Sequence, residues 1–196
     1  MSTRIINLEP ITSLQDGDYI VVDNKTKNLR VASEIFYVLK LVSQYANLVA
    51  EDLGFLTADV RKMLKESGFP GMNVLEFAFG GEDSNYLPHN YEKNCVVYTG
   101  THDNMTMRQW LDTAGPEALR YAVEYMNLSE GEGLVWGTIR TAMSSVSDLC
   151  VVPLQDYLGL GAESRMNTPS TLGGNWRWRV TKEQLSEKLQ QEREAE

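Results

Sequence analysis

The sequence predicts an α/β fold with a parallel β-sheet, and three observations lead to this prediction. Short continuous apolar runs, typical of parallel strands buried on both faces, recur at residues 48–50, 74–79, 95–98 and 149–152. Segments with helical spacing of apolar residues separate these runs. Carboxylates follow two of the runs, with Glu51 after the first and Asp103 after the third. Because α/β enzymes gather catalytic groups at the C-terminal ends of strands, both carboxylates are candidate functional residues.

The first 33 residues differ in character from the rest of the chain. Residues 19–22 and 29–31 are strand-like, and the polar stretch between them predicts a turn. Ser33 is a helix-capping residue in front of an apolar helix expected over residues 34–45. We therefore expect residues 1–33 to form a small β-hairpin that is separate from the α/β part of the chain.

Capping residues and prolines predict where helices begin in the α/β part. The signals are Thr57 for the first helix, Pro116 for the second, the capping box Ser129–Glu132 for the third, and Thr181 with Gln184 for the C-terminal tail. The first helix is expected to end at Gly68, since glycine readily adopts the left-handed conformation that terminates helices. The charged tail is expected to be a solvated outer helix or a fraying end, and not a binding surface.

Composition excludes several classes of protein. The 196 residues carry a net charge of −9, which argues against nucleic-acid binding because neutralising phosphates requires clustered Lys and Arg. We find no apolar run long enough to span a membrane and no apolar segment typical of a secretory signal. Cys95 and Cys150 lie in apolar runs and are expected to be buried free thiols, which suits a cytoplasmic protein. The chain has neither a Cys/His cluster nor a Gly-rich phosphate loop, so no metal or other cofactor is implied.

A series of short motifs gives the most specific information. They are Ala-Glu-Asp-Leu-Gly-Phe-Leu-Thr (50–57), Gly-Phe-Pro-Gly-Met (68–72), Phe-Ala-Phe (77–79), Tyr-Leu-Pro-His-Asn-Tyr (86–91), Tyr-Thr-Gly-Thr-His-Asp-Asn (98–104), Pro-Leu-Gln-Asp-Tyr-Leu-Gly-Leu-Gly (153–161), Arg-Met-Asn-Thr-Pro (165–169) and Gly-Asn-Trp-Arg-Trp-Arg (174–179). In this order, the motifs resemble the C-terminal part of the 4-α-glucanotransferases, also called amylomaltases or disproportionating enzymes (glycoside hydrolase family 77). The resemblance covers residues 45–179, about two thirds of the chain.

The resemblance implies a fold as well as a function. The family's enzymes form a (β/α)8 TIM barrel, so residues 34–196 are expected to be the C-terminal half of such a barrel, with the 1–33 hairpin as an appendage. The hairpin segment loosely resembles N-terminal segments of phage virion and tail-fibre proteins. The family's nucleophile lies in an Arg-x-Asp-His-like motif, which this sequence does not contain. Asp23 ends a strand-like run upstream of Glu51, but no Arg stands two residues before it, so it is a poor substitute.

The resemblance also assigns roles to the two strand-end carboxylates. A retaining transglycosylase needs one carboxylate as nucleophile and another as general acid/base. By resemblance, Glu51 is the acid/base and Asp103 is the acid that grips sugar hydroxyls and stabilises the oxocarbenium-like transition state. Asp52 is expected to point away from Glu51 and to have a structural role.

Further residues are candidates for substrate binding. By resemblance His102 hydrogen-bonds the same sugar as Asp103, and we expect Asn104 to contact substrate too. Asn175 and Trp176 offer an amide and a stacking ring to a glucan, although Trp176 and Trp178 suit core or barrel-closing positions equally well. His89 fits either a cleft or a loop-stabilising role. Met105 departs from the acidic residue often present there in the family, which puts local loop contacts in doubt.

The expected function is therefore that of a cytoplasmic 4-α-glucanotransferase acting on α-1,4-glucans and maltooligosaccharides by a retaining mechanism. Three hypotheses follow. The chain is an inactive fragment that carries two of three catalytic acids, or it is one half of a split enzyme completed by another polypeptide. The third alternative is a non-catalytic glucan-binding or virion-associated module. A half-barrel exposes raw sheet edges, so self-association or a complementing half-barrel chain is expected.

Overall fold

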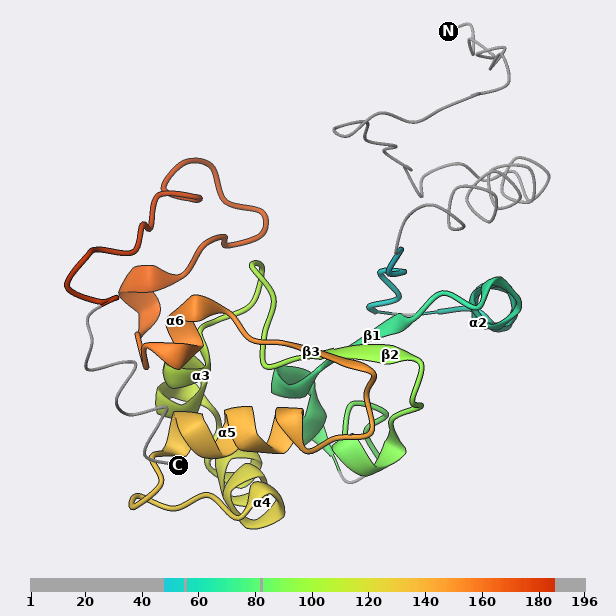
Figure 1. The fold of residues 1–196 in the computed structure, drawn as a ribbon, viewed down its shortest axis with the longest axis horizontal. Helices are drawn as coiled ribbons and strands as arrows, with labels where there is room; N and C mark the ends of the chain where they lie inside the picture. The colour runs from blue at the N-terminus through green and yellow to red at the C-terminus, as the bar shows by residue number, and fades with distance from the viewer. Residues whose placement is uncertain (1–47, 55, 82, 186–196) are drawn as a thin grey trace, which may run out of the picture. The chain divides into compact units, whose positions relative to one another are not determined.

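The computed structural model describes residues 48–185, apart from 55 and 82. The chain divides into two compact units, residues 1–45 and 46–196, and every described residue belongs to the second unit (Figure 1). The hairpin expected at residues 19–31, the helix expected over 34–45 and most of the C-terminal tail lie outside the described residues. These predictions, and the proposed division at residue 33, remain untested.

A three-stranded parallel sheet in the order β1-β2-β3 organises the second unit. Its strands are β1 (Gly71–Val74), β2 (Cys95–Tyr98) and β3 (Leu149–Val151). Gly71 is aligned with Cys95, and Val96 with Leu149, so the three strands end at the same edge of the sheet. The prediction of a parallel sheet is confirmed, with β2 matching its predicted range and β3 ending one residue earlier than expected.

Two strand predictions were wrong. Residues 48–50 form no regular strand, although the Ala50 N–H donates to the Pro70 carbonyl (2.9 Å) and holds this segment beside the start of β1. The apolar run at 74–79 is not a strand either, because β1 ends at Val74 and a 3-10 helix, η1 (Leu75–Gly80), follows. The physical reason is the spacing of the buried residues of η1, since Leu75, Ala78 and Phe79 recur at helical intervals and face the core.

The helices are α2 (Ala58–Ser67), α3 (Met107–Thr113), α4 (Pro116–Met126), α5 (Leu134–Met143) and α6 (Leu154–Tyr157), with short 3-10 turns η2 (Pro88–Asn90) and η3 (Ala162–Ser164). The predicted cap of α2 is confirmed, because Thr57 Oγ1 accepts from the Val60 N–H at 3.4 Å. Its predicted end is confirmed as well, since Gly68 has a left-handed φ of 73°. Pro116 begins α4 as expected.

Other helix predictions needed correction. Helix α5 begins at Leu134, not at the predicted capping box, because Ser129 Oγ caps only the local turn through the Glu132 N–H (3.3 Å). The Glu132 carboxylate instead binds Arg140 within α5 at 2.6 Å. Helix α3 was not predicted, although Thr106 caps it by accepting from the Gln109 N–H at 3.1 Å. The expected Thr181–Gln184 pairing is present, in a turn at the end of the described range.

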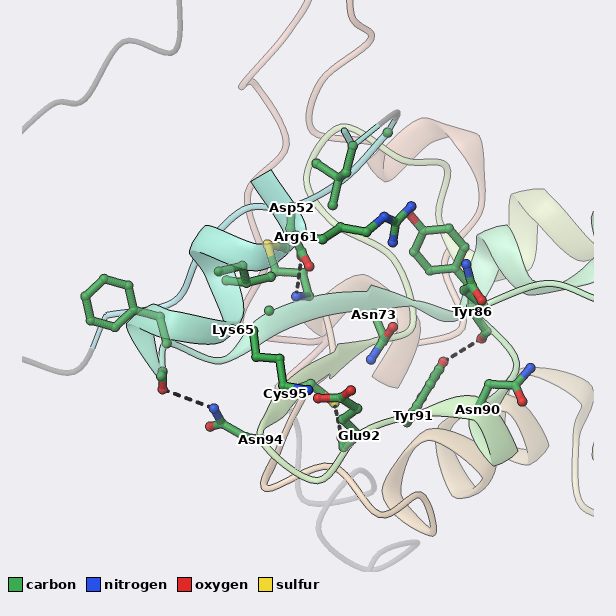
Figure 2. Close-up of a pocket in the computed structure, with 18 residues that line it drawn as sticks. Asp52, Arg61, Lys65, Asn73, Tyr86, Asn90, Tyr91, Glu92, Asn94 and Cys95 are labelled. Carbon is green, nitrogen blue, oxygen red and sulfur yellow. Dashed lines mark hydrogen bonds between the residues drawn. The ribbon is translucent and has the colours of Figure 1, made fainter. Parts of the chain in front are cut away.

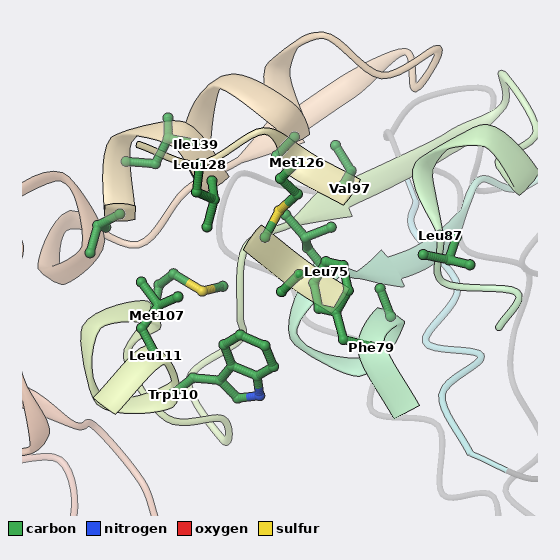
Figure 3. Close-up of a cluster of buried hydrophobic side chains, with 14 of the residues drawn as sticks. Leu75, Phe79, Leu87, Val97, Met107, Trp110, Leu111, Met126, Leu128 and Ile139 are labelled. Atoms are coloured by element: carbon green, nitrogen blue, oxygen red, sulfur yellow. The ribbon is translucent and has the colours of Figure 1, made fainter. Parts of the chain in front are cut away.

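The hydrophobic core lies between the sheet and helices α3, α4 and α5 (Figures 1 and 3). Cys95 and Val97, at alternating positions of β2, face this core. The largest helical contributions come from Met107 and Trp110 of α3, Met126 of α4 and Ile139 of α5, all buried. This layer fixes the sheet from one side and leaves the carboxyl ends of the strands free to carry polar loops.

Apolar side chains remain exposed along β3. Within the described ranges β3 pairs only with β2, and its Leu149 and Val151 are 52% and 38% exposed. The two cysteines are free thiols, as predicted, but only Cys95 is fully buried. In the part of the chain that the structure describes, no helix is long and apolar enough to cross a membrane.

Candidate active site

A cavity of about 690 Å³ lies at the carboxyl ends of the strands, and we call it the strand-end cavity. Its lining includes Glu51, Tyr98, His102, Asp103, Asn104 and Val151. Four of the six residues predicted to bind or transform substrate therefore line one cavity. Asn175 and Trp176 do not line it.

The position of Glu51 is fixed by the residues on either side of it. Asp52 Oδ1 accepts from the Met72 N–H of β1 at 2.7 Å, so the Asp52 side chain has the structural role expected of it. The Asp52 carboxylate packs tightly against the backbone of Gly71, where an added Cβ would lie only 2.6 Å from Asp52 Oδ2. With Asp52 bound to β1, Glu51 stays exposed and lines the strand-end cavity.

A compact turn after β2 presents His102 and Asp103. Asn104 Oδ1 accepts from both the backbone N–H and the Oγ1 of Thr101, at 2.9 and 2.7 Å. Thr101 Oγ1 in turn accepts from the Asp103 N–H at 3.3 Å. Short polar side chains stabilise such turns by replacing backbone partners. Asn104 thus holds the turn with its carbonyl oxygen, and its expected contact with substrate remains a prediction.

Two residues that the sequence analysis did not single out hold this turn from outside. Asn167 Nδ2 donates to Asp103 Oδ1 at 2.6 Å, and the Asn167 N–H donates to the His102 carbonyl at 3.1 Å. Arg165 donates through Nη2 to the Asp103 carbonyl and through Nε to the Asn167 carbonyl, both at 2.9 Å. The Arg-Met-Asn-Thr-Pro motif was the available signal, but nothing in the sequence linked it to Asp103.

These contacts define the chemistry that Asp103 can perform. Its Oδ1 accepts from Asn167 and also lies 3.4 Å from His102 Nε2. Both side chains of the His102–Asp103 pair are about half exposed. A carboxylate held on one oxygen by an amide leaves the other oxygen available to a hydroxyl-rich ligand in the cavity.

The two predicted residues near the C-terminus have different surroundings. Asn175 is used internally, because its Oδ1 accepts from the Thr168 N–H and its Nδ2 donates to Thr171 Oγ1, both at 3.0 Å. The Trp176 indole is 51% exposed, and its ring centre lies 5.1 Å from that of His102. Trp176 therefore offers an open aromatic face next to the His102 ring.

His89 has a partner that favours the loop-stabilising role. Its Nδ1 lies 2.7 Å from the Tyr125 hydroxyl of α4, and the two rings are 5.7 Å apart. His89 does not line the strand-end cavity.

Two buried carboxyl groups, neither predicted as a site residue from the sequence, lie behind the turn. Glu76 of η1 is only 7% exposed. Burial, and secondly the nearby Asp156, raise the pKa of Glu76 to about 7, against the opposing effect of Arg165. Burial also raises the pKa of Asp156, although Thr99 Oγ1 (2.6 Å) and the Met107 N–H (2.7 Å) donate to its carboxylate. Perturbed carboxyls beside a cavity are typical of functional sites.

A second cavity, of about 480 Å³, lies between α2, β1 and the loop before β2, and we call it the outer cavity (Figure 2). Arg61 and Lys65 of α2, Asn73 of β1, and Tyr86 and Asn90 of the loop line it. Of the residues named from the sequence as catalytic or substrate-binding, none lies there. Across the described ranges, no group of three or more His, Cys, Asp or Glu side chains is arranged to hold a metal ion.

Comparison with known proteins gives a consistent result. The sequence model of the 4-alpha-glucanotransferase family (glycoside hydrolase family 77) matches residues 22–185. The chain is 52% identical to the 4-alpha-glucanotransferase of Clostridium butyricum over 149 residues, covering 75% of this chain and 31% of the relative. It is 49% identical to the chloroplastic/amyloplastic 4-alpha-glucanotransferase DPE1 of Arabidopsis thaliana, and this match covers 68% of this chain and 23% of the relative.

A solved structure agrees with these relatives. The amylomaltase from Streptococcus agalactiae in complex with acarbose superimposes with a TM-score of 0.76 at 37% identity, covering 81% of this chain and 32% of that one. The chain therefore belongs to the 4-alpha-glucanotransferase family and spans about a third or less of the length of these relatives. The virion-associated alternative gains no support from these matches.

Proposed function

We propose that this chain supplies part of the active site of a 4-α-glucanotransferase, which moves α-1,4-glucan segments between maltooligosaccharides by a retaining mechanism. The observation that carries the proposal is that Glu51, His102 and Asp103 line one cavity at the carboxyl ends of parallel strands. Family membership supports the reaction class.

In this proposal Glu51 is the general acid/base. It donates a proton to the glycosidic oxygen as the bond to the anomeric carbon breaks, and it later takes the proton from the acceptor hydroxyl. The anomeric carbon is meanwhile bonded to a nucleophilic carboxylate, which leaves when the acceptor oxygen attacks. Exposure of Glu51 to the strand-end cavity suits this role.

Asp103, His102 and Trp176 bind the sugar. The Asp103 oxygen not held by Asn167 accepts from a sugar hydroxyl, and His102 hydrogen-bonds the same ring. The exposed face of Trp176 stacks on a neighbouring glucose. Asn167 and Arg165 keep Asp103 in place, so less ordering is left to occur when substrate binds.

The nucleophile comes from polypeptide beyond these 196 residues, because the family's Arg-x-Asp-His-like motif does not occur in them.

We propose that residues 34–196 are the C-terminal half of a TIM barrel. The first half pairs with the edge of β3, whether it precedes this sequence in a longer protein or belongs to another chain. Two observations support the proposal: among the described residues β3 pairs only with β2, and its Leu149 and Val151 side chains are exposed. We also propose a cytoplasmic location, which suits the two free cysteines.

A chimera tests the proposed activity. Residues 46–196 replace the matching C-terminal part of the Clostridium butyricum relative, and the product is incubated with maltotriose. We expect glucose and a ladder of longer maltooligosaccharides. Glu51→Gln should reduce the rate at least about 10³-fold, because loss of a catalytic member usually has effects of this size or larger.

Glu117→Gln is the matched control, since Glu117 is an exposed carboxylate in the first turn of α4. It should leave the ladder unchanged. A chimera that is folded and active with Glu51→Gln would contradict the assignment of the acid/base. A chimera that is folded but inactive, with Glu51 intact, would contradict the proposed function of this segment.

A further inference from the structure

The buried carboxylate of Glu76 lies directly against the turn that carries the sugar-binding residues. Glu76 follows the end of β1 by two residues, and its backbone N–H donates to the Thr99 carbonyl at the end of β2 (3.2 Å). A Cβ on Gly100 would lie 3.5 Å from Glu76 Oε2, an ordinary van der Waals distance, so the carboxylate lies next to Gly100. Glu76 therefore lies behind the residues that begin the turn.

Asn104 connects Glu76 to this turn. Interactions with the Asn104 side chain and the Met105 backbone act to lower the pKa of Glu76, so both groups lie next to its carboxylate. A Cβ on Gly100 would lie 3.4 Å from Asn104 Cβ and 3.5 Å from Glu76 Oε2, which places the two side chains around the same point. Because Asn104 Oδ1 already accepts from Thr101, Nδ2 is the Asn104 atom that is free to donate toward Glu76. Thr101 Oγ1 then accepts from the Asp103 N–H. A chain of contacts thus leads from the buried carboxylate through Asn104 and Thr101 to Asp103.

The charged groups that face Glu76 come from two other elements. Asp156 of α6 repels its negative charge, and Arg165, which follows η3, attracts it. Arg165 also donates to the Asp103 carbonyl, so it provides a second route between Glu76 and the turn. Glu76 Oε2 has no hydrogen-bond partner among the described residues, an arrangement that is costly for an ionised carboxylate.

We propose that Glu76 is a positioning residue, which holds the turn from Thr101 to Asn104 through the Asn104 side chain and so sets Asp103 and His102 in the strand-end cavity. It does not touch the sugar. Since burial and Asp156 raise its pKa to about 7, the Glu76 carboxyl changes charge across neutral pH. The consequence for glucan binding rests on the proposed function, whereas the coupling between Glu76 and the turn does not.

The coupling is tested by NMR on the 15N-labelled full chain without ligand. Between pH 5.5 and 8.5, we expect the Asn104 side-chain amide and the Thr101 and Asp103 backbone amides to shift with a common midpoint. Glu76→Gln should remove this transition, and Glu117→Gln should retain it.

A transition that persists unchanged in folded Glu76→Gln would overturn the proposal. If Glu76→Gln does not fold, Asn104→Ala decides the matter instead. In Asn104→Ala, the Thr101 and Asp103 backbone amides should no longer shift between pH 5.5 and 8.5. If they still shift, the proposal is overturned.

Calorimetric titration with maltoheptaose tests the consequence for function. We expect the dissociation constant of the wild-type chain to change about five-fold or more across this pH range, and that of Glu76→Gln to stay flat. If neither the wild type nor Glu117→Gln binds maltoheptaose, the proposed function fails, while the NMR result still decides the role of Glu76. If both bind and Glu76→Gln keeps the wild-type pH dependence, the positioning role fails.

Discussion

Replacing Glu76 with glutamine should change how the stability of the protein depends on pH. In the unfolded chain Glu76 ionises near its ordinary pKa of 4.5, whereas in the folded protein its pKa is raised to about 7. Between these values the unfolded state binds fewer protons, so wild-type stability falls as pH rises and levels off above pH 7. From pH 5.5 to 8.5 this loss amounts to about 2 kcal/mol. Glutamine does not ionise and lacks this loss.

A second effect of the substitution is independent of pH. The Glu76 Oε2 atom has no hydrogen-bond partner among the described residues, so an amide nitrogen in its place would be buried without an acceptor. This unsatisfied amide lowers stability by about 1–3 kcal/mol at every pH, which offsets part of the stability gained by removing the ionisable group. The change in the stability difference between pH 5.5 and 8.5 therefore isolates the ionisation of Glu76.

Urea unfolding of the full chain measures this difference. Trp110 is buried in the core between α3 and η1, and its fluorescence reports the loss of that core. The free energy of unfolding of Glu76→Gln relative to wild type should rise by about 2 kcal/mol from pH 5.5 to 8.5, and that of Glu117→Gln should stay constant. Parallel pH dependences for wild type and Glu76→Gln would refute the argument that the buried carboxyl is forced to ionise in the fold.

Three further predictions concern the core, the site and a helix cap. Ile139→Ala should destabilise the protein by about 2–5 kcal/mol in the same assay, because Ile139 is fully buried, while exposed Val146→Ala should have almost no effect. Asn167→Asp places a carboxylate where an amide now donates to Asp103, and calorimetry should show maltoheptaose binding weakened about ten-fold or more; unchanged affinity would contradict it. Thr57→Ala should increase amide hydrogen exchange in α2 by the equivalent of about 1 kcal/mol, with α4 unaffected.

Local signals predicted part of the fold well. Strand β2 was predicted over its observed range because Cys95–Tyr98 is a short apolar run that ends just before a turn. The start of α4 and the cap of α2 followed from Pro116 and Thr57, residues that act within one turn of themselves. By contrast, the run at 74–79 is equally compatible with a strand and a buried helical turn, and tertiary packing selected the 3-10 helix.

The contacts that build the site could not be predicted in the same way. Arg165 and Asn167 lie 62 and 64 residues from the Asp103 atoms that they bind, and no local pattern encodes such a pairing. Glu76 stands in an apolar run that was predicted to be a strand buried on both faces, and no local pattern marked it as a functional carboxyl. Its burial beside Gly100 depends on η1, a 3-10 helix that the sequence did not predict. The acids named from the family resemblance were found at the same cavity because the motif order already reflected the fold.

The central claim is that Glu51 and Asp103 act on the same glucan in the strand-end cavity, and its most direct test is to map where maltoheptaose binds. We would titrate the 15N-labelled chain with maltoheptaose and follow the backbone amides. The account predicts shifts at residues 51–54 and 100–104 together, with the outer-cavity residues Tyr86 and Asn90 as internal controls that do not shift. Shifts concentrated at Tyr86 and Asn90, with residues 51–54 and 100–104 unchanged, would contradict it.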